Sequence, residues 1–223
     1  MDGFTLKYII ILICEITIVY ALYVFLVNIL KRSSYAVNRL FSIISLLTVG
    51  MITCQLLPFF IASINITILA RWYFGLIIII NQAFFHYTQI FPRWEKKSPL
   101  IFIITSAIPG LITFLFTVIS NDIIISASFD GLHIQFVYGQ YIILYLVVFV
   151  FYIAGTFFTL FYKVRHLENT SFRYQLYYLF MGNHVGALII LISFVIMPYV
   201  FKCFNYHNLG ITFAAFWLLY INN

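Results

Sequence analysis

The side chains that could take part in chemistry are few, and most of them lie inside long apolar stretches of the sequence. Glu15 is the one carboxylate in such a stretch, where an ionisable group costs at least about 2.5 kcal/mol unless it is paired or hydrated. Gln82, His86 and Gln89 follow an i, i+4, i+7 spacing, which places them on one face of a helix. The candidates for a buried polar cluster that senses a ligand are Glu15, Gln82, His86, Asn183 and His184.

Three interpretations of this polar cluster are open. Its members could be structural, joined by hydrogen bonds between helices that are worth roughly 0.6 to 2 kcal/mol each in a membrane. They could instead sense a signal or a proton, because histidine and a desolvated glutamate can both titrate near neutral pH. A metal site is the third interpretation, but no HxxxH or HExxH spacing supports it. We therefore expect neither a metal ion nor another cofactor.

Motifs typical of enzymes are missing from the sequence. It contains no GxSxG, no glycine-rich phosphate loop and no paired carboxylates. We expect that the chain is not an enzyme, and we assign no catalytic residue.

The composition is that of a protein surrounded by lipid. Hydrophobic residues make up 64% of the 223 positions and charged residues 8%, whereas soluble domains carry about 25% charged residues. The formal charge of +6 comes from basic residues in short clusters between apolar runs, so we read it as a signal of membrane topology. The lipid bilayer is the expected partner, and nucleic acid is not.

The apolar windows predict an all-α integral membrane protein, with a bundle of seven helices in one domain that covers residues 1–223. A span needs roughly 20 apolar residues. Proline and glycine within the spans, such as Gly75 and the pair Pro109 and Gly110, should bend or thin helices where neighbours can satisfy the freed backbone groups. The predicted spans are residues 8–30, 40–62, 69–90, 99–120, 137–161, 174–198 and 208–223.

The distribution of basic residues predicts the orientation of the bundle. Three connections, 31–39, 92–98 and 162–173, hold nine of the twelve lysines and arginines. Because cytoplasmic loops carry an excess of basic residues, these connections should lie in the cytoplasm. The N-terminus is then outside and the C-terminus cytoplasmic.

The long connection between the fourth and fifth spans predicts a small β-hairpin on the outer side. Residues 123–129 and 132–136 flank the pair Asp130 and Gly131, and an Asp-Gly pair between apolar strands is a strong hairpin signal. Asp130, Gly131 and His133 would form an outer lid or part of a ligand site. Alternatively, the hairpin is a structured loop that packs against the bundle.

Several short segments give the chain a resemblance to a known family. In their order and spacing they resemble the N-terminal seven-transmembrane sensor region of bacterial histidine kinases and related signalling receptors. That resemblance implies a sensor module in the bacterial cytoplasmic membrane, which detects an unknown stimulus and passes it to a cytoplasmic effector. The segments are Asn38 to Phe41, Phe84 to Thr88, Phe91 with Pro92, Tyr138 with Gly139, and Arg173 to Leu176.

The sequence departs from the family because no kinase or cyclase motif follows the last predicted span, 208–223. We expect that the polypeptide does not signal alone. It would act through a separate cytoplasmic kinase or cyclase, or it would be the sensor part of a longer receptor. The first rival function is a small-solute transporter. The second is an intramembrane enzyme built on Glu15, His86 and His184.

Overall fold

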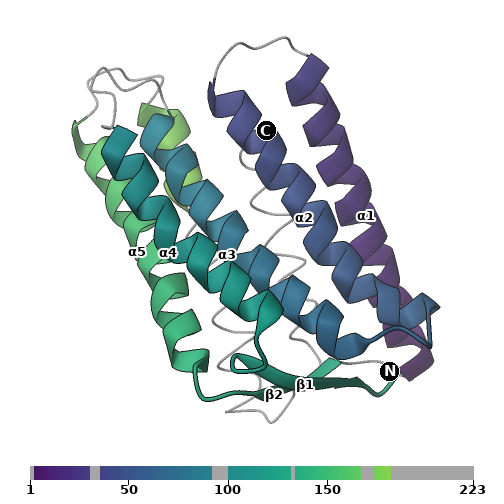
Figure 1. Cartoon of the computed structure of the whole chain (residues 1–223). Helices are drawn as coiled ribbons and strands as arrows, with labels where there is room; N and C mark the ends of the chain where they lie inside the picture. The colour runs from purple at the N-terminus through teal and green to yellow at the C-terminus, as the bar shows by residue number, and fades with distance from the viewer. Residues whose placement is uncertain (1–2, 31–35, 92–99, 132–133, 167–172, 182–223) are drawn as a thin grey trace.

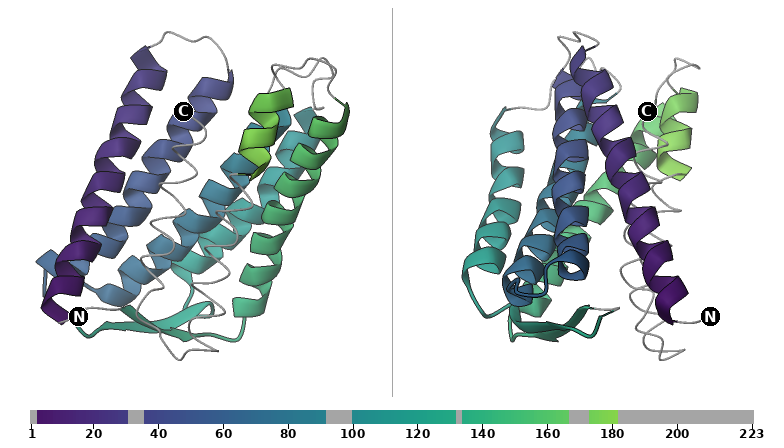
Figure 2. Two further views of the ribbon diagram at one scale, coloured as in Figure 1. Left: turned by 180° about the vertical axis from the view of Figure 1, so that it is seen from behind. Right: turned by 90° about the vertical axis from the view of Figure 1, so that its right-hand side faces the viewer.

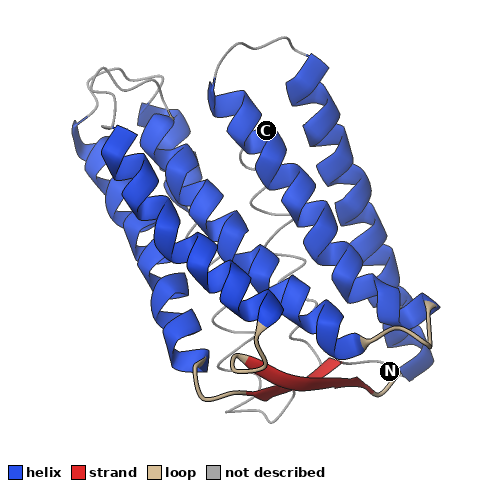
Figure 3. Cartoon of the chain, in the orientation of Figure 1, coloured by secondary structure: helices blue, strands red, loops and turns tan. Residues whose placement is uncertain are grey.

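A computed structural model describes residues 3–30, 36–91, 100–131, 134–166 and 173–181 of the chain (Figure 1). Five of its helices are long and apolar enough to cross a membrane, so the chain is a multi-pass membrane protein. A two-stranded sheet lies at one end of the helices (Figure 3). The elements are α1 Gly3–Leu30, α2 Ala36–Phe60, α3 Ile66–Ile90, α4 Leu100–Ile119, β1 Ile124–Phe129, β2 Ile134–Tyr138 and α5 Ile142–His166.

The five labelled helices correspond to the first five predicted spans. The fifth helix begins and ends five residues later than the predicted 137–161, because residues 137 and 138 belong to β2. Residues 173–181 are helical and coincide with the start of the sixth predicted span. The remainder of that span and the seventh span lie outside the described residues.

Helix α3 is the central element. It packs against α2, α4, α5 and strand β1, whereas α1 packs mainly against α2. Figure 2 shows α1 and α2 as one neighbouring pair and α3, α4 and α5 as an adjacent group. The segment 173–181 lies beside α5, where the ring of Phe180 meets those of Phe157 and Phe161.

Apolar side chains both fill the bundle and cover it. One buried cluster surrounds Phe74 near the sheet, and a second surrounds Leu160 near the opposite end. Large apolar side chains also point outward from α1, α4 and α5, as Val19, Ile112 and Ile143 do. Such a surface suits hydrocarbon, where close packing and hydrogen bonds between helices hold a bundle together.

The predicted hairpin is confirmed. Strands β1 and β2 are antiparallel, with Phe129 opposite Ile134 and Ile124 opposite Tyr138. Gly131 has a φ of 93°, a conformation that residues with a Cβ rarely adopt. The turn differs from the two-residue turn that the Asp-Gly pair suggests, because residues 130–133 separate the paired ends of the strands.

Helix α3 binds the hairpin through two side chains near its first turns. The Arg71 guanidinium donates hydrogen bonds to the carbonyl oxygens of Ile124 and Ile125, at 3.1 and 3.4 Å. The Thr67 hydroxyl accepts a hydrogen bond from the backbone N–H of Ala127 at 3.0 Å. These bonds fix the hairpin to α3 through the backbone of β1.

The other end of helix α3 is bound by Lys163 of α5. The Lys163 ammonium donates hydrogen bonds to the carbonyl oxygens of Thr88, Gln89 and Phe91, at 2.6, 2.9 and 2.9 Å. The last carbonyls of a helix have no partner within the helix and carry its partial negative charge, so an ammonium with three donors suits them. Sequence analysis placed Lys163 in the connection 162–173, but it is buried within α5.

Replacing Lys163 with methionine should lower the stability of the protein. The variant Lys163→Met keeps the apolar stem but leaves buried carbonyls at the end of α3 unpartnered, which costs about 1 to 3 kcal/mol. Thermal unfolding in detergent measures this effect. The matched control is Arg165→Met, because Arg165 is exposed and its guanidinium rests on the ring of Phe161. Equal midpoints for the two variants would contradict the assigned role of Lys163.

Candidate functional site: the polar face of helix α3

The structure buries two members of the predicted cluster and exposes a third. Gln82 and His86 lie one turn apart on α3, and each is 9% exposed. Glu15 lies on an exposed face of α1, so it is not buried together with them. Asn183 and His184 lie outside the described residues. The structure therefore shows where the α3 residues of the cluster lie. Contact between them and the sixth span remains a prediction.

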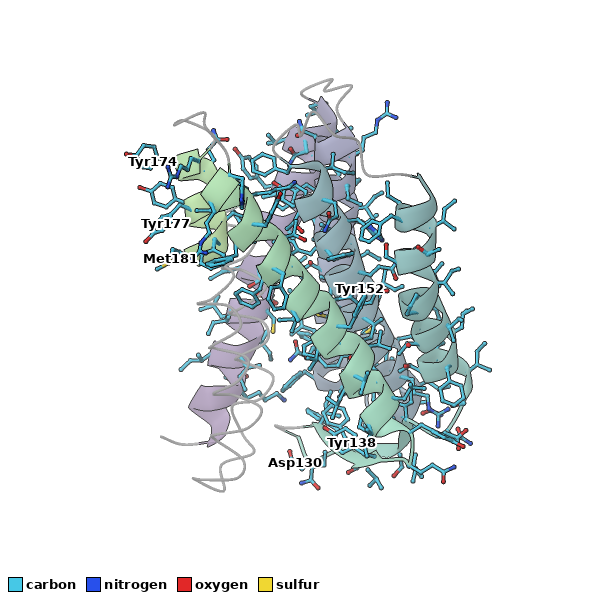
Figure 4. All side chains as sticks on the ribbon, turned by 90° about the vertical axis from the view of Figure 1, so that its left-hand side faces the viewer. Asp130, Tyr138, Tyr152, Tyr174, Tyr177 and Met181 are labelled. Carbon is cyan, nitrogen blue, oxygen red and sulfur yellow. The ribbon has the colours of Figure 1, made fainter. Side chains whose placement is uncertain are left out.

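The predicted lid residues lie at the tip of the hairpin, far from this face. Asp130 and Gly131 are exposed there, and His133 is not among the described residues. Figure 4 shows Asp130 at one end of the molecule and Tyr152 in the middle of the bundle. The hairpin tip and the polar face of α3 are thus separate places.

Gln82 packs against α4 at Gly110. A Cβ added at Gly110 would overlap the Oε1 atom of Gln82 and would lie 2.7 Å from the Tyr152 hydroxyl oxygen. Only glycine leaves room for both side chains. The neighbour at Gly110 is thus a polar side chain rather than another backbone.

Tyr152 of α5 forms hydrogen bonds with the backbone of helix α4 beside Pro109. Its hydroxyl donates to the carbonyl oxygen of Ser106 at 2.7 Å and accepts from the backbone N–H of Gly110 at 2.8 Å. Residues 106 and 110 are the i and i+4 partners of an ordinary helical bond. Pro109 precedes Gly110, and a proline ring forces a helix open. The Tyr152 hydroxyl therefore bridges these two backbone groups, and we call this place beside Pro109 the opening of α4.

His86 lies one turn beyond Gln82, and neither of its buried ring nitrogens has a hydrogen-bond partner among the described residues. Because α3 and α4 are antiparallel and Gln82 meets Gly110, one turn along each helix places His86 at the level of Ser106. The Oε1 atom of Gln82 is also buried without a partner. Buried polar atoms in native proteins are almost always hydrogen-bonded, so these three atoms mark a site.

The polar face continues toward the end of α3. Gln89 donates a hydrogen bond to the Thr159 hydroxyl of α5 at 2.6 Å. Gly155 brings α5 close to α3, because an added Cβ there would lie 2.7 Å from the ring of Phe85. This lower part of the face is satisfied within the bundle, in contrast to the part at Gln82 and His86.

The surroundings of Gln82 and His86 carry no formal charge. In α3, α4 and α5, charged side chains occur only toward helix ends, at Arg71, Lys163 and Arg165. Within the described residues there is also no group of three histidine, cysteine or carboxylate side chains that could hold a metal ion. The arrangement can therefore recognise a neutral group by hydrogen bonds.

Sequence analysis did not identify Tyr152, Ser106 or Lys163 as functional. Nothing in the sequence links Tyr152 to the Pro109 and Gly110 pair, which lies 42 residues earlier. The position of Lys163 between apolar residues could have indicated that it belongs to a helix. Its basic charge instead led to its assignment to a cytoplasmic connection. Comparison of the chain with known protein families, with curated proteins and with solved structures finds no match.

Removing the Tyr152 hydroxyl should destabilise the bundle more than removing a similar hydroxyl elsewhere. In Tyr152→Phe, two buried backbone groups of α4 lose their partner, whereas Tyr145→Phe frees only the carbonyl oxygen of Phe74. We expect a loss of about 2 to 4 kcal/mol for Tyr152→Phe and about half of that for Tyr145→Phe. Thermal unfolding in one detergent compares them, and the reverse order would refute the assignment.

Proposed function

We propose that this chain is a membrane-embedded signal-sensing module of a bacterial receptor, located in the cytoplasmic membrane. The observation that carries this proposal is that α3 is bound at both ends by side-chain hydrogen bonds. Thr67 and Arg71 join it to the hairpin, and Lys163 joins its other end to α5. Its 25 residues rise about 37 Å, enough to cross the hydrocarbon core.

A receptor needs one element whose position is biased from both sides of the membrane. Helix α3 has the required connections, because a change in the hairpin acts directly on Thr67 and Arg71. The helix transmits that displacement to the carbonyls that bind Lys163. Helix α5 and the connection after it then carry the change to an effector.

The proposed orientation places the hairpin outside the cell and Lys163 at the cytoplasmic end of a seven-helix bundle. The connections 31–39, 92–98 and 162–173 join helix ends that lie opposite the hairpin (Figure 1). They hold most of the basic residues, as cytoplasmic loops do. Their common location supports the proposed topology, with the N-terminus outside.

Reporter fusions should test this topology directly. Alkaline phosphatase joined within 92–98 or 167–172 should be inactive, because it requires export, whereas fusion at the hairpin tip should be active. Fluorescent protein should give the opposite pattern. Phosphatase activity at either basic connection would overturn the orientation.

The stimulus and the effector belong to the proposal. The resemblance to histidine-kinase sensor regions supports a separate or attached cytoplasmic kinase or cyclase as the effector. The basic connections offer a surface to which an acidic partner could dock. The stimulus would reach α3 through the hairpin or through the polar face at His86.

A second candidate function is a small-solute transporter. The opening of α4 at Pro109, which Tyr152 occupies, resembles the interrupted helices that line transport sites near the middle of a membrane. A transporter would move a solute past this opening. A receptor would change conformation without net movement of solute.

One experiment separates the two functions. Trp72 lies at the hairpin end with its ring edge-on to Phe114, and it becomes the only tryptophan in a Trp94→Phe, Trp217→Phe variant. A fluorophore on His166→Cys, with Cys14, Cys54 and Cys203 replaced, reports on the end of α5. Candidate compounds are added to liposomes that contain this variant. Three quantities are measured for each compound: the fluorescence of Trp72, the fluorescence of the label at residue 166, and uptake of the compound into the liposomes. A change in Trp72 fluorescence that saturates with concentration indicates binding.

For a receptor we expect one compound to change both signals without uptake. Lys163→Met should preserve the Trp72 response and reduce the response at residue 166 by more than half, and Arg165→Met should preserve both. Saturable uptake of the compound, with no signal at residue 166, would favour the transporter and contradict the proposed function.

A further inference from the structure

Three polar atoms on one buried face of α3 have no hydrogen-bond partner within the part of the chain that the structure describes. They are Oε1 of Gln82 and the two ring nitrogens of His86. Both side chains are nine-tenths buried, and they project from successive turns of the same helix. One isolated polar atom without a partner can result from local packing alone. Three such atoms on successive turns of one helix share a common environment and indicate a common ligand.

Two further polar groups lie at this level of the bundle, one on α4 and one on α5. The Tyr152 hydroxyl lies beside Gly110 together with Oε1 of Gln82, and its oxygen keeps a lone pair after its two backbone contacts. The Ser106 hydroxyl donates its hydrogen bond to the carbonyl oxygen of Phe102, at 2.6 Å, and its oxygen can still accept one. Donors and acceptors from three helices thus converge at the level where α4 opens.

The chemistry of these groups defines the molecule that would satisfy them. Gln82 Oε1 needs a donor, while a neutral His86 ring needs an acceptor for its N–H and a donor for its other nitrogen. A hydroxyl group both donates and accepts. An ion is unsuited, because charged side chains in α3, α4 and α5 lie only toward helix ends.

We propose that Gln82, His86, Ser106 and Tyr152 form a buried binding site for small neutral hydroxyl-bearing molecules between α3, α4 and α5. The shared chemistry is that of water and of a small alcohol. The site bridges His86 to Gln82 and to the opening of α4, so its occupant holds the three helices together. This inference does not depend on the chain being a receptor, because a transporter would contain the same site.

Nuclear magnetic resonance of the His86 ring tests the occupancy. The full chain, labelled with ¹⁵N-histidine, is placed in lipid nanodiscs, and the His86 signals are those missing from His86→Phe. We expect a ring N–H that is hydrogen-bonded and has a magnetisation-transfer peak to a hydroxyl. In buffer without alcohol this peak should arise from water. A peak that appears only after 1-butanol is added would identify an alcohol site, which also supports the proposal.

A ring without hydrogen-bonded nitrogens in both samples would overturn the proposal, since the site would then be dry. Unfolding midpoints provide the second measurement. If one bound molecule forms hydrogen bonds with both His86 and Gln82, then His86→Phe and Gln82→Met should each lower the unfolding midpoint. The double variant should lower it by clearly less than the sum of the two.

The matched control is Gln89→Met, on the same face of α3 but already bonded to Thr159. Its effect should add to that of His86→Phe. In a dry site, removing an orphaned polar group relieves a penalty, so both apolar substitutions would raise the midpoint. A rise, or simple additivity between His86→Phe and Gln82→Met, would contradict a shared site.

Discussion

The structure depends on the need of each buried backbone group for a hydrogen-bond partner from the protein, because burial removes that group from water. Three side chains meet this need where regular structure ends or opens. Arg71 binds carbonyl oxygens of β1, Tyr152 binds the backbone at the opening of α4, and Lys163 binds carbonyl oxygens at the end of α3. Each belongs to a neighbouring element, so the bonds that satisfy the backbone also decide which elements pack together. Helix α3 carries Arg71, its end is bound by Lys163, and it packs against α4, which Tyr152 binds. These contacts explain its central position.

Much of the architecture could be predicted, because composition and spacing are local properties. Apolar windows located the five described membrane helices, and the Asp130 and Gly131 pair located the hairpin. Gln82 and His86, which are spaced i, i+4, are both buried on α3. Glu15 is exposed instead, because counting along α1 gives the depth of a residue and not the direction in which it points. Partnerships such as that of Tyr152 with α4 join distant parts of the chain, and no local pattern predicts them.

These contacts also divide the bundle into parts with different tasks. The hairpin and the ends of α3 are joined by satisfied hydrogen bonds, which suits a path that transmits a displacement. Between them, Gln82 and His86 leave polar atoms unsatisfied beside an opened helix, which suits a place where a molecule enters or leaves. A protein that only needed stability would have filled this place with apolar side chains.

The central claim is that α3 couples the hairpin to the opposite end of the bundle. Residue-resolved hydrogen exchange in nanodiscs tests this most directly, with Lys163→Met compared with the wild type and with Arg165→Met. Loosening the last turn of α3 should speed exchange both there and in the amides that pair β1 with β2, at the far end of the helix. Arg165→Met should leave both regions unchanged. Faster exchange confined to residues 87–91, with an unaltered hairpin, would contradict the account.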